Sequence, residues 1–249
     1  MYGIENCGPW VRTHGRLLRT HFSDLDSVHP IHGDVSHLPL SGESVDLIIS
    51  IEAISHYYDV PRFLDECARV LRPGGWLLIS DGNNGANATI RAETEELWER
   101  LEVGPKGPCM SHEIKDTMVD RRKRIIREQF PQISEEQAGN LAEATSGMVK
   151  AEIQSAVASH LSGGRAPDSY YKRGTCTREP EWGHWIEWLF DPRELGRDIA
   201  RRGFDVRLVP HYGGARNDMI LAANTILRQF PSFRFARAFR IAAQKKRQR

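Results

Sequence analysis

The pattern of apolar positions between residues 45 and 81 predicts a strand, a helix and a second strand. Two short apolar runs, Val45–Ile51 and Trp76–Ile79, are rich in branched residues, which is typical of strands buried on both faces. Between them, apolar residues recur with helical spacing at Phe63, Leu64, Cys67, Val70 and Leu71. The sequence Arg72-Pro73-Gly74-Gly75 is expected to end this helix, because proline cannot continue it and glycine permits a left-handed cap. Together these elements predict a right-handed βαβ crossover in a parallel sheet.

Helices and strands continue to alternate outside this unit. In chain order, we expect an amphipathic helix within residues 10–25, a strand at 28–32, a helix at 89–103, two helices within 111–162, a helix from 192 to 203, a strand at 206–209, a helix at 219–227 and a strand at 239–243. The second helix of the 111–162 pair should start at Ser134, where Gln137 completes a capping box, and run to Leu161. This order predicts an α/β fold with a mostly parallel central sheet and a helical insertion.

Composition narrows the function classes. The formal net charge of the 249 residues is +1, which does not indicate a general nucleic-acid binder. The basic run Arg121–Arg124 is either a nucleic-acid face or a solvated helix face, and the acids near it favour the second interpretation. The four cysteines are far apart in sequence, which suggests neither a disulfide framework nor a metal site. Without a signal peptide or a membrane-length apolar run, we expect a cytoplasmic protein.

A longer series of residues resembles a known family. The series is Asp34, Leu38-Pro39, Val45-Asp46-Leu47-Ile48-Ile49-Ser50, His56 and Arg69-Val70-Leu71-Arg72-Pro73-Gly74-Gly75. It is similar to the class I S-adenosylmethionine-dependent methyltransferases, in the small-molecule subgroup often called methyltransferase type 11. The resemblance implies a Rossmann-like sheet, S-adenosyl-L-methionine as cofactor, no metal, and methyl transfer to a small-molecule acceptor. The competing interpretation is an ordinary buried βαβ unit without a cofactor.

The resemblance implies a nucleoside site at the ends of the first strands. The stretch Tyr2–Glu5 resembles the end of the family's second strand, where Glu5 would accept hydrogen bonds from both ribose hydroxyls. Asp34 and the backbone of Val35 would then contact the adenine edge. The alternatives are that Glu5 is a solvated acid near a chain terminus and that Asp34 is a turn or N-cap residue.

Two further positions follow from the same resemblance. Ser50 and Ile51 would lie beside the methionine arm, because ligands bind at the carboxyl ends of strands in open parallel sheets. His56 would orient the acceptor or act as a general base. A histidine that holds a loop through hydrogen bonds is an equally good interpretation, since methyl transfer to a good nucleophile needs little beyond in-line placement.

One expected feature of the family is absent from the sequence. The family's first strand and glycine-rich turn should precede Tyr2, yet no G-x-G-x-G occurs downstream. We therefore expect a sheet without its first strand, and we favour truncation over a rebuilt N-terminus. Residues 1–103 would form the truncated N-terminal part of the core, 104–181 a helical insertion or lid, and 182–249 the C-terminal part with a basic tail. The alternative function is a non-catalytic fragment or interaction protein that no longer binds the cofactor.

Overall fold

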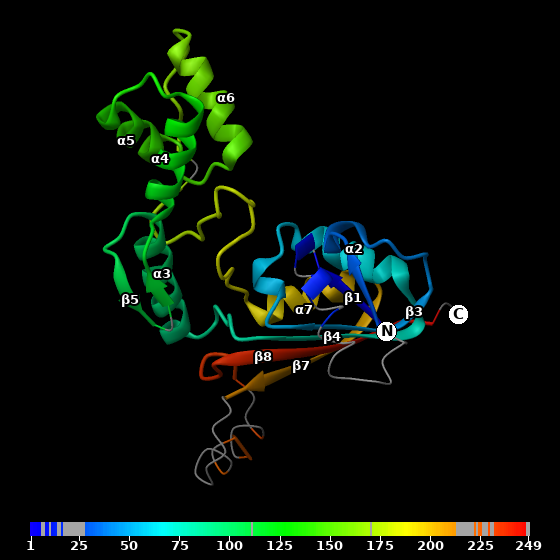
Figure 1. Ribbon diagram of the computed structural model, residues 1–249. Coiled ribbons are helices and arrows are strands. Elements are labelled where there is room, and N and C mark those ends of the chain that lie inside the picture. Colours follow the sequence, from blue (N-terminus) through cyan, green and yellow to red (C-terminus); the bar gives the residue numbers. More distant parts are fainter. Residues whose placement is uncertain are drawn as a thin grey trace. The chain divides into compact units, whose positions relative to one another are not determined.

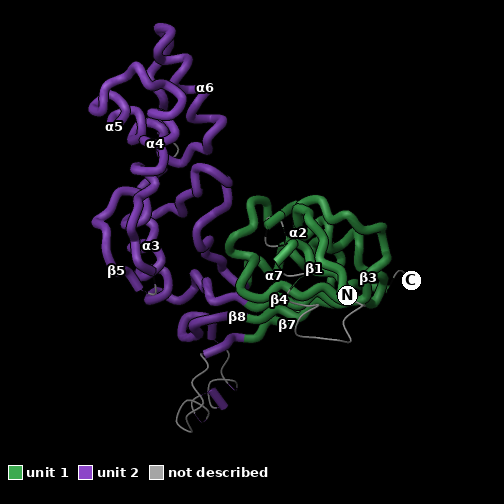
Figure 2. Tube along the Cα trace, in the orientation of Figure 1, with its two compact units in different colours: residues 1–80, 193–209, 240–249 green, residues 81–192, 210–239 purple. Residues whose placement is uncertain are grey.

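The computed structural model divides into two compact units. It describes residues 1–5, 8–9, 11–13, 16, 28–110, 112–169, 171–212, 222, 224–225, 229 and 232–247 (Figure 1). The helices expected within residues 10–25 and 219–227 fall mostly outside these residues. Unit 1 comprises residues 1–80, 193–209 and 240–249, and unit 2 comprises residues 81–192 and 210–239 (Figure 2). No helix in the described part of the chain is long and apolar enough to cross a membrane.

The strands of unit 1 belong to two separate sheets. The strands are β1 (Tyr2–Glu5), β2 (His29–His32), β3 (Val45–Ile51), β4 (Leu71–Asp81), β7 (Phe204–His211) and β8 (Ala238–Lys245). β1 pairs with β2 in parallel, and β3 pairs with β4 in parallel within a four-stranded sheet of order β3-β4-β8-β7. The predicted α/β class with parallel pairing is therefore confirmed. The strands that end at Glu5 and Ile51 do not pair directly.

Two helices lie on the same side of the four-stranded sheet. These are α2 (Val60–Val70) and α7 (Pro192–Arg201), as Figure 1 shows. Asp59 caps α2 by accepting a hydrogen bond from the backbone N–H of Arg62 at 2.9 Å. Gly196 lets α7 approach β7 closely, because a Cβ at this position would lie 2.9 Å from Leu208 Cδ2. The predicted strand–helix–strand unit is present, and its helix packs on one side of the sheet.

The predicted cap at the end of α2 is wrong. The helix stops at Val70, and β4 already begins at Leu71, which has extended backbone angles. The residue before Pro73 is sterically disfavoured in the helical region, so the chain turns into a strand before the two glycines are reached. Gly75 serves close packing instead, since a Cβ there would lie 2.9 Å from the Arg72 carbonyl oxygen.

The expectation that β3 is buried on both faces is also wrong. Ser50 is only 3 % exposed, but Leu47, Ile49 and Ile51 on the opposite face are 47, 56 and 64 % exposed. Trp76, beside Leu47 on β4, is 42 % exposed. Helices α2 and α7 lie on the side of the sheet opposite to these exposed side chains (Figure 1).

Unit 2 is built mainly from helices. Its elements are α3 (Ala88–Glu102), β5 (Gly107–Cys109), β6 (His112–Ile114), α4 (Met118–Gln129), α5 (Glu135–Ala144) and α6 (Lys150–Leu161). The capping box of Ser134 and Gln137 is confirmed at the start of α5. The single helix expected from Ser134 to Leu161 is instead split into α5 and α6. The chain turns between them at Gly147, whose φ of +80° favours glycine.

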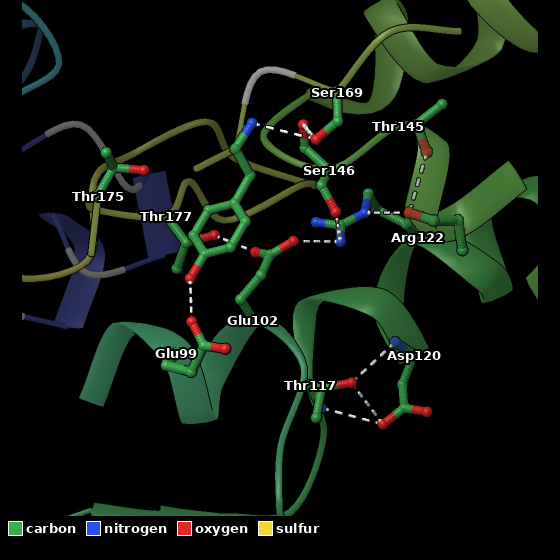
Figure 3. Close-up of polar contacts among 12 residues, drawn as sticks. Glu99, Glu102, Thr117, Asp120, Arg122, Thr145, Ser146, Ser169, Thr175 and Thr177 are labelled. Atoms are coloured by element: carbon green, nitrogen blue, oxygen red, sulfur yellow. Dashed lines mark hydrogen bonds and ion pairs between the residues drawn. The ribbon is translucent and has the colours of Figure 1, made fainter. Parts of the chain in front are cut away.

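A buried polar cluster joins α3 to α4 and to two later segments (Figure 3). The side chains of Arg122 and Glu102 are fully buried and form an ion pair. Arg122 also donates to Ser146 Oγ at 2.8 Å and to the Ala142 carbonyl oxygen at 2.8 Å. Thr177 donates its hydroxyl hydrogen to the other carboxylate oxygen of Glu102. Arg122 is thus a core residue, which corrects the expectation that the whole basic run is a solvated face.

The other members of the basic run also have acidic partners. Arg121 pairs with Glu179 at 3.0 Å, and Arg124 pairs with Asp116 at 2.9 Å. The remaining member, Lys123, pairs with Glu135. The positive charges of α4 are therefore matched inside unit 2.

Candidate functional site

Two predicted acids lie at the same end of the β1–β2 pair. The carbonyl oxygen of Glu5 accepts a hydrogen bond from the Gly33 N–H at 3.0 Å, which continues the parallel register beyond the strands. Asp34 follows directly, so both acids lie at the carboxyl end of this sheet. Glu5 is half-buried, and Asp34 is exposed. This edge is where ligands bind in parallel sheets, and the local geometry leaves both acids near solvent.

Asp34 also caps the short 3-10 helix η1 (Val35–His37). Its Oδ1 atom accepts a hydrogen bond from the Ser36 N–H at 2.8 Å, so the capping role weighed from the sequence is real. A carboxylate has two oxygens, and within the described residues Oδ2 of Asp34 makes no hydrogen bond. The cap therefore fixes the carboxylate while leaving one oxygen available to a ligand.

The loop that carries Asp34 is anchored to α2 by a buried glutamate. Glu66 accepts a hydrogen bond from the Leu38 N–H at 2.8 Å and pairs with Arg69 at 2.7 Å. Arg69 in turn donates to the carbonyl oxygens of Leu38 and Leu40 at 2.9 and 2.8 Å. The hydrogen bond from Arg69, helped by that from Leu38, lowers the pKa of Glu66 below its ordinary value.

Glu66 and Arg69 were not predicted as site residues. Their signal in the sequence is an acid three residues before an arginine on one helix face, a spacing that usually marks a weak surface pair. The partner that makes Glu66 important is a backbone amide 28 positions earlier, which no local pattern reveals. We therefore regard both as positioning residues for the Asp34 loop.

The second group of predicted residues lies at the end of β3. Ser50 is buried, and its Oγ lies 3.1 Å from the Tyr57 hydroxyl, which joins the strand end to the turn that carries His56. His56 itself is exposed on the 3-10 helix η2 (Ile54–His56). Ile51 is 64 % exposed, so its side chain is accessible to a ligand.

The residue after Ile51 has an unusual backbone. Glu52 has a φ of +47°, in the left-handed region, and its N–H donates to the Ser80 carbonyl oxygen of β4 at 2.8 Å. Such a conformation costs free energy for a non-glycine residue and persists where the surroundings hold it, which happens often at ligand-binding edges. Sequence reasoning missed Glu52, and only the backbone angle points to it.

The predicted residues thus form two groups rather than one. Glu5, Asp34 and Val35 come together at the end of the β1–β2 pair, while Ser50, Ile51 and His56 come together at the end of β3. A cavity of about 550 Å³ lies shortly after β1, and the described residues that line it are Pro9, Arg12, Thr13 and Arg16.

The comparisons with known proteins identify the segment that carries these strand ends. The methyltransferase domain family matches residues 10–79. Residues 10–79 are thus similar to a methyltransferase domain. This finding confirms the predicted resemblance to S-adenosylmethionine-dependent methyltransferases for the part of the chain that includes Asp34, Ser50 and His56.

Individual relatives match over similarly short stretches. A probable S-adenosylmethionine-dependent methyltransferase of Mycolicibacterium smegmatis is 46 % identical over 52 residues, which is 21 % of this chain and 20 % of that protein. The malonyl-[acyl-carrier protein] O-methyltransferase of Methylococcus capsulatus is 42 % identical over 76 residues, 30 % of this chain and 28 % of that protein. The phthiotriol/phenolphthiotriol dimycocerosates methyltransferase of Mycobacterium leprae is 51 % identical over 57 residues, 23 % of this chain and 21 % of that protein. The matched stretch therefore spans between a fifth and three tenths of each relative.

Proposed function

We propose that the chain binds S-adenosyl-L-methionine and transfers its methyl group to a small-molecule acceptor. The observation that carries this proposal is the pair of carboxylates, Glu5 and Asp34, at the carboxyl end of one parallel strand pair. Asp34 belongs to the segment that matches methyltransferase domains. Two acids at such an edge suit the hydroxyl and amino groups of a nucleoside, which are hydrogen-bond donors.

The residues present fit the nucleoside half of the cofactor. Glu5 would accept from the ribose hydroxyls, and the unengaged Oδ2 of Asp34 would accept from the adenine amino group, beside the backbone of Val35. Ser50 and Ile51 would lie along the methionine arm. When bound, the cofactor supplies an electrophilic methyl group on its sulfonium. Catalysis would then depend mainly on placing the acceptor in line with that methyl group.

His56 is a candidate for handling a proton. It lies on the turn that the Ser50–Tyr57 contact holds against the end of β3, and its imidazole is exposed. An acceptor hydroxyl or amine that loses a proton on methylation could give it to this ring. We propose His56 for that role, with orientation of the acceptor as its minimum contribution.

Isothermal titration of the full chain with S-adenosylhomocysteine tests the proposal. Asp34→Asn keeps a capping oxygen for η1 but removes the charge, so the fold should be retained. Because a hydrogen bond to a charged group contributes about 1.5–3 kcal/mol, we expect Asp34→Asn and Glu5→Gln each to weaken binding by about 10- to 100-fold.

Asp168→Asn is the matched control, because Asp168 is an exposed acid of unit 2 outside the proposed site. It should leave the dissociation constant unchanged. Absence of binding heat with the folded wild-type chain at millimolar ligand would contradict the proposal. That outcome would favour the alternative function, a methyltransferase-like interaction protein that does not bind the cofactor.

A further inference from the structure

Strand β3 has a glutamate with a left-handed backbone just beyond each of its ends. Glu43 precedes the strand with a φ of +52°, and Glu52 follows it with a φ of +47°. A hydrogen bond from each N–H group holds these backbones, to the Arg69 carbonyl oxygen at 3.0 Å for Glu43 and to the Ser80 carbonyl oxygen at 2.8 Å for Glu52. Glycine would adopt these angles without strain, whereas a residue with a Cβ costs free energy there. Residues held in this way are concentrated at ligand sites and tight turns.

The two glutamates lie at opposite edges of the sheet. Because β3 and β4 are parallel, Glu43 lies at their amino edge and Glu52 at their carboxyl edge. The carboxylate of Glu43 has a structural partner, since it lies 3.5 Å from Lys245 Nζ. Ligands bind at the carboxyl edge of a parallel sheet, and Glu52 directly follows Ser50 and Ile51 there. Its position makes Glu52 the candidate for a ligand contact and Glu43 a matched control.

A positive charge distinguishes the cofactor from its product at this edge. The inference rests on the proposed function, in which Ser50 and Ile51 lie along the methionine arm and His56 lies near the acceptor. Glu52 stands between these residues in the chain, and the sulfonium with its methyl group is the part of the cofactor that must face the acceptor. The sulfonium has no N–H or O–H group to donate, so a carboxylate recognises it by charge.

We propose that the carboxylate of Glu52 selects S-adenosyl-L-methionine over S-adenosylhomocysteine by attracting the sulfonium charge. When the methyl group is transferred, the electron pair of its bond to sulfur stays on sulfur, and the product has a neutral thioether. A fixed negative charge at this point therefore binds the methyl donor more tightly than the spent product.

This role concerns binding and not the rate of the chemical step. Positive charge leaves the sulfur as the methyl group moves, so a carboxylate that stabilises the bound sulfonium does not by itself lower the barrier. Glu52 would instead help the donor to replace the product at the site. His56 keeps the separate role proposed for it above.

The ratio of two dissociation constants isolates this contact from others that a carboxylate could make. The ammonium group of the methionine arm is a second cation, but both ligands have it. A contact with that ammonium group would therefore change both dissociation constants by the same factor. The acceptor is absent from a titration of the chain with one ligand, so a contact with the acceptor does not affect the ratio either. Only a contact that depends on the sulfonium changes the ratio.

Isothermal titration of the full chain with each ligand at low ionic strength tests the proposal. Wild type should bind S-adenosyl-L-methionine at least about tenfold more tightly than S-adenosylhomocysteine, as expected for unit charges a few ångströms apart and partly screened. Glu52→Gln should abolish this preference, mainly by weakening the binding of S-adenosyl-L-methionine. Glu43→Gln removes the same charge from the other edge of the sheet and should keep the preference.

A second variant and a change of salt separate charge from structure. Glu52→Gly removes the side chain and suits the left-handed backbone, so the chain should fold and the preference should again be lost. Raising the ionic strength from about 0.01 M to about 1 M shortens the Debye length from about 30 Å to about 3 Å. This change should reduce the preference of wild type and leave the ratio for Glu52→Gln unchanged.

Three results would overturn the proposal. They are equal affinity of wild type for the two ligands, equal weakening of both ligands by Glu52→Gln, and loss of the preference in Glu43→Gln. Equal weakening would assign the carboxylate to the ammonium group of the methionine arm. In each of these cases the cofactor still binds, so the proposed function stands and only the role of Glu52 is rejected. If neither ligand binds the folded chain, the proposed function fails and the role of Glu52 fails with it.

Discussion

Isoleucine side chains are buried in the helical core of unit 2 but exposed on one face of the sheet of unit 1. In the helical core, Ile126 and Ile153 are fully buried, and even the guanidinium of Arg122 is enclosed and paired (Figure 3). In the sheet, Ile49 is 56 % exposed although its strand has the sequence of an interior strand. Helices that follow one another in sequence supply each other's packing partners. A parallel strand needs a covering layer on each face, and the helix that follows β3 in sequence covers only one of them.

The largest effect should come from breaking the buried ion pair of unit 2. We expect Glu102→Ala to lower the free energy of unfolding by about 3–5 kcal/mol, because it leaves the Arg122 guanidinium buried without its carboxylate. Urea unfolding of the full chain measures the change.

Glu194→Ala serves as the control for this experiment, since Glu194 belongs to an exposed pair with Arg197 at 3.3 Å. It should cost at most about 0.5 kcal/mol. If Glu102→Ala cost as little as the control, unit 2 would not be the tightly packed region described above.

The next effect is a direct comparison of two isoleucines. Ile126→Ala removes methyl groups from a fully buried position and should cost about 2–5 kcal/mol. Ile49→Ala changes an exposed position of β3 and should cost no more than about 0.5 kcal/mol in the chain alone. Equal losses in thermal or urea unfolding would show that Ile49 is covered in solution and would remove the contrast between the regions.

The smallest effect concerns the anchor of the Asp34 loop. The pKa of Glu66 is lowered in the folded chain, so its contribution to stability is present above the unfolded pKa of about 4.3 and disappears as pH falls through the lower folded value. Glu66→Gln should therefore cost about 1 kcal/mol at pH 7 and nothing near pH 2. Unfolding curves between these pH values measure the difference. A cost independent of pH would contradict an ionic role.

The sequence predicted those features that depend on near neighbours. The strand–helix–strand unit, the capping box at Ser134 and the end of β2 follow from patterns within a few residues, and the structure has them. The strand that ends at Glu5 was predicted from the family resemblance, and it is also present. The position of Asp34 at the end of β2 could also be predicted, because an acid directly after a short strand is a local signal. Its capping bond to Ser36 agrees with the alternative that the sequence left open.

Other features could not be predicted from the sequence, because they depend on contacts with residues far away in the chain. Arg122 lies in a run of basic residues, and only Glu102 and Ser146, 20 and 24 positions away, make its burial possible. The anchoring of the Asp34 loop by Glu66 and the left-handed backbone of Glu52 likewise need contacts between separate strands or helices. The exposure of β3 could not be predicted, because apolar residues on both faces of a strand do not show whether a helix covers each face.

The central claim is that the carboxyl ends of β1 and β2 hold the nucleoside of S-adenosyl-L-methionine and that the end of β3 holds its methionine arm. Titration of the ¹⁵N-labelled full chain with S-adenosylhomocysteine, followed by amide chemical shifts, tests it most directly. We predict that the largest shifts gather at Glu5, at Asp34–Ser36 and at Ser50–Glu52. Shifts confined to other residues, or a spectrum of the folded chain that does not change at millimolar ligand, would contradict the claim.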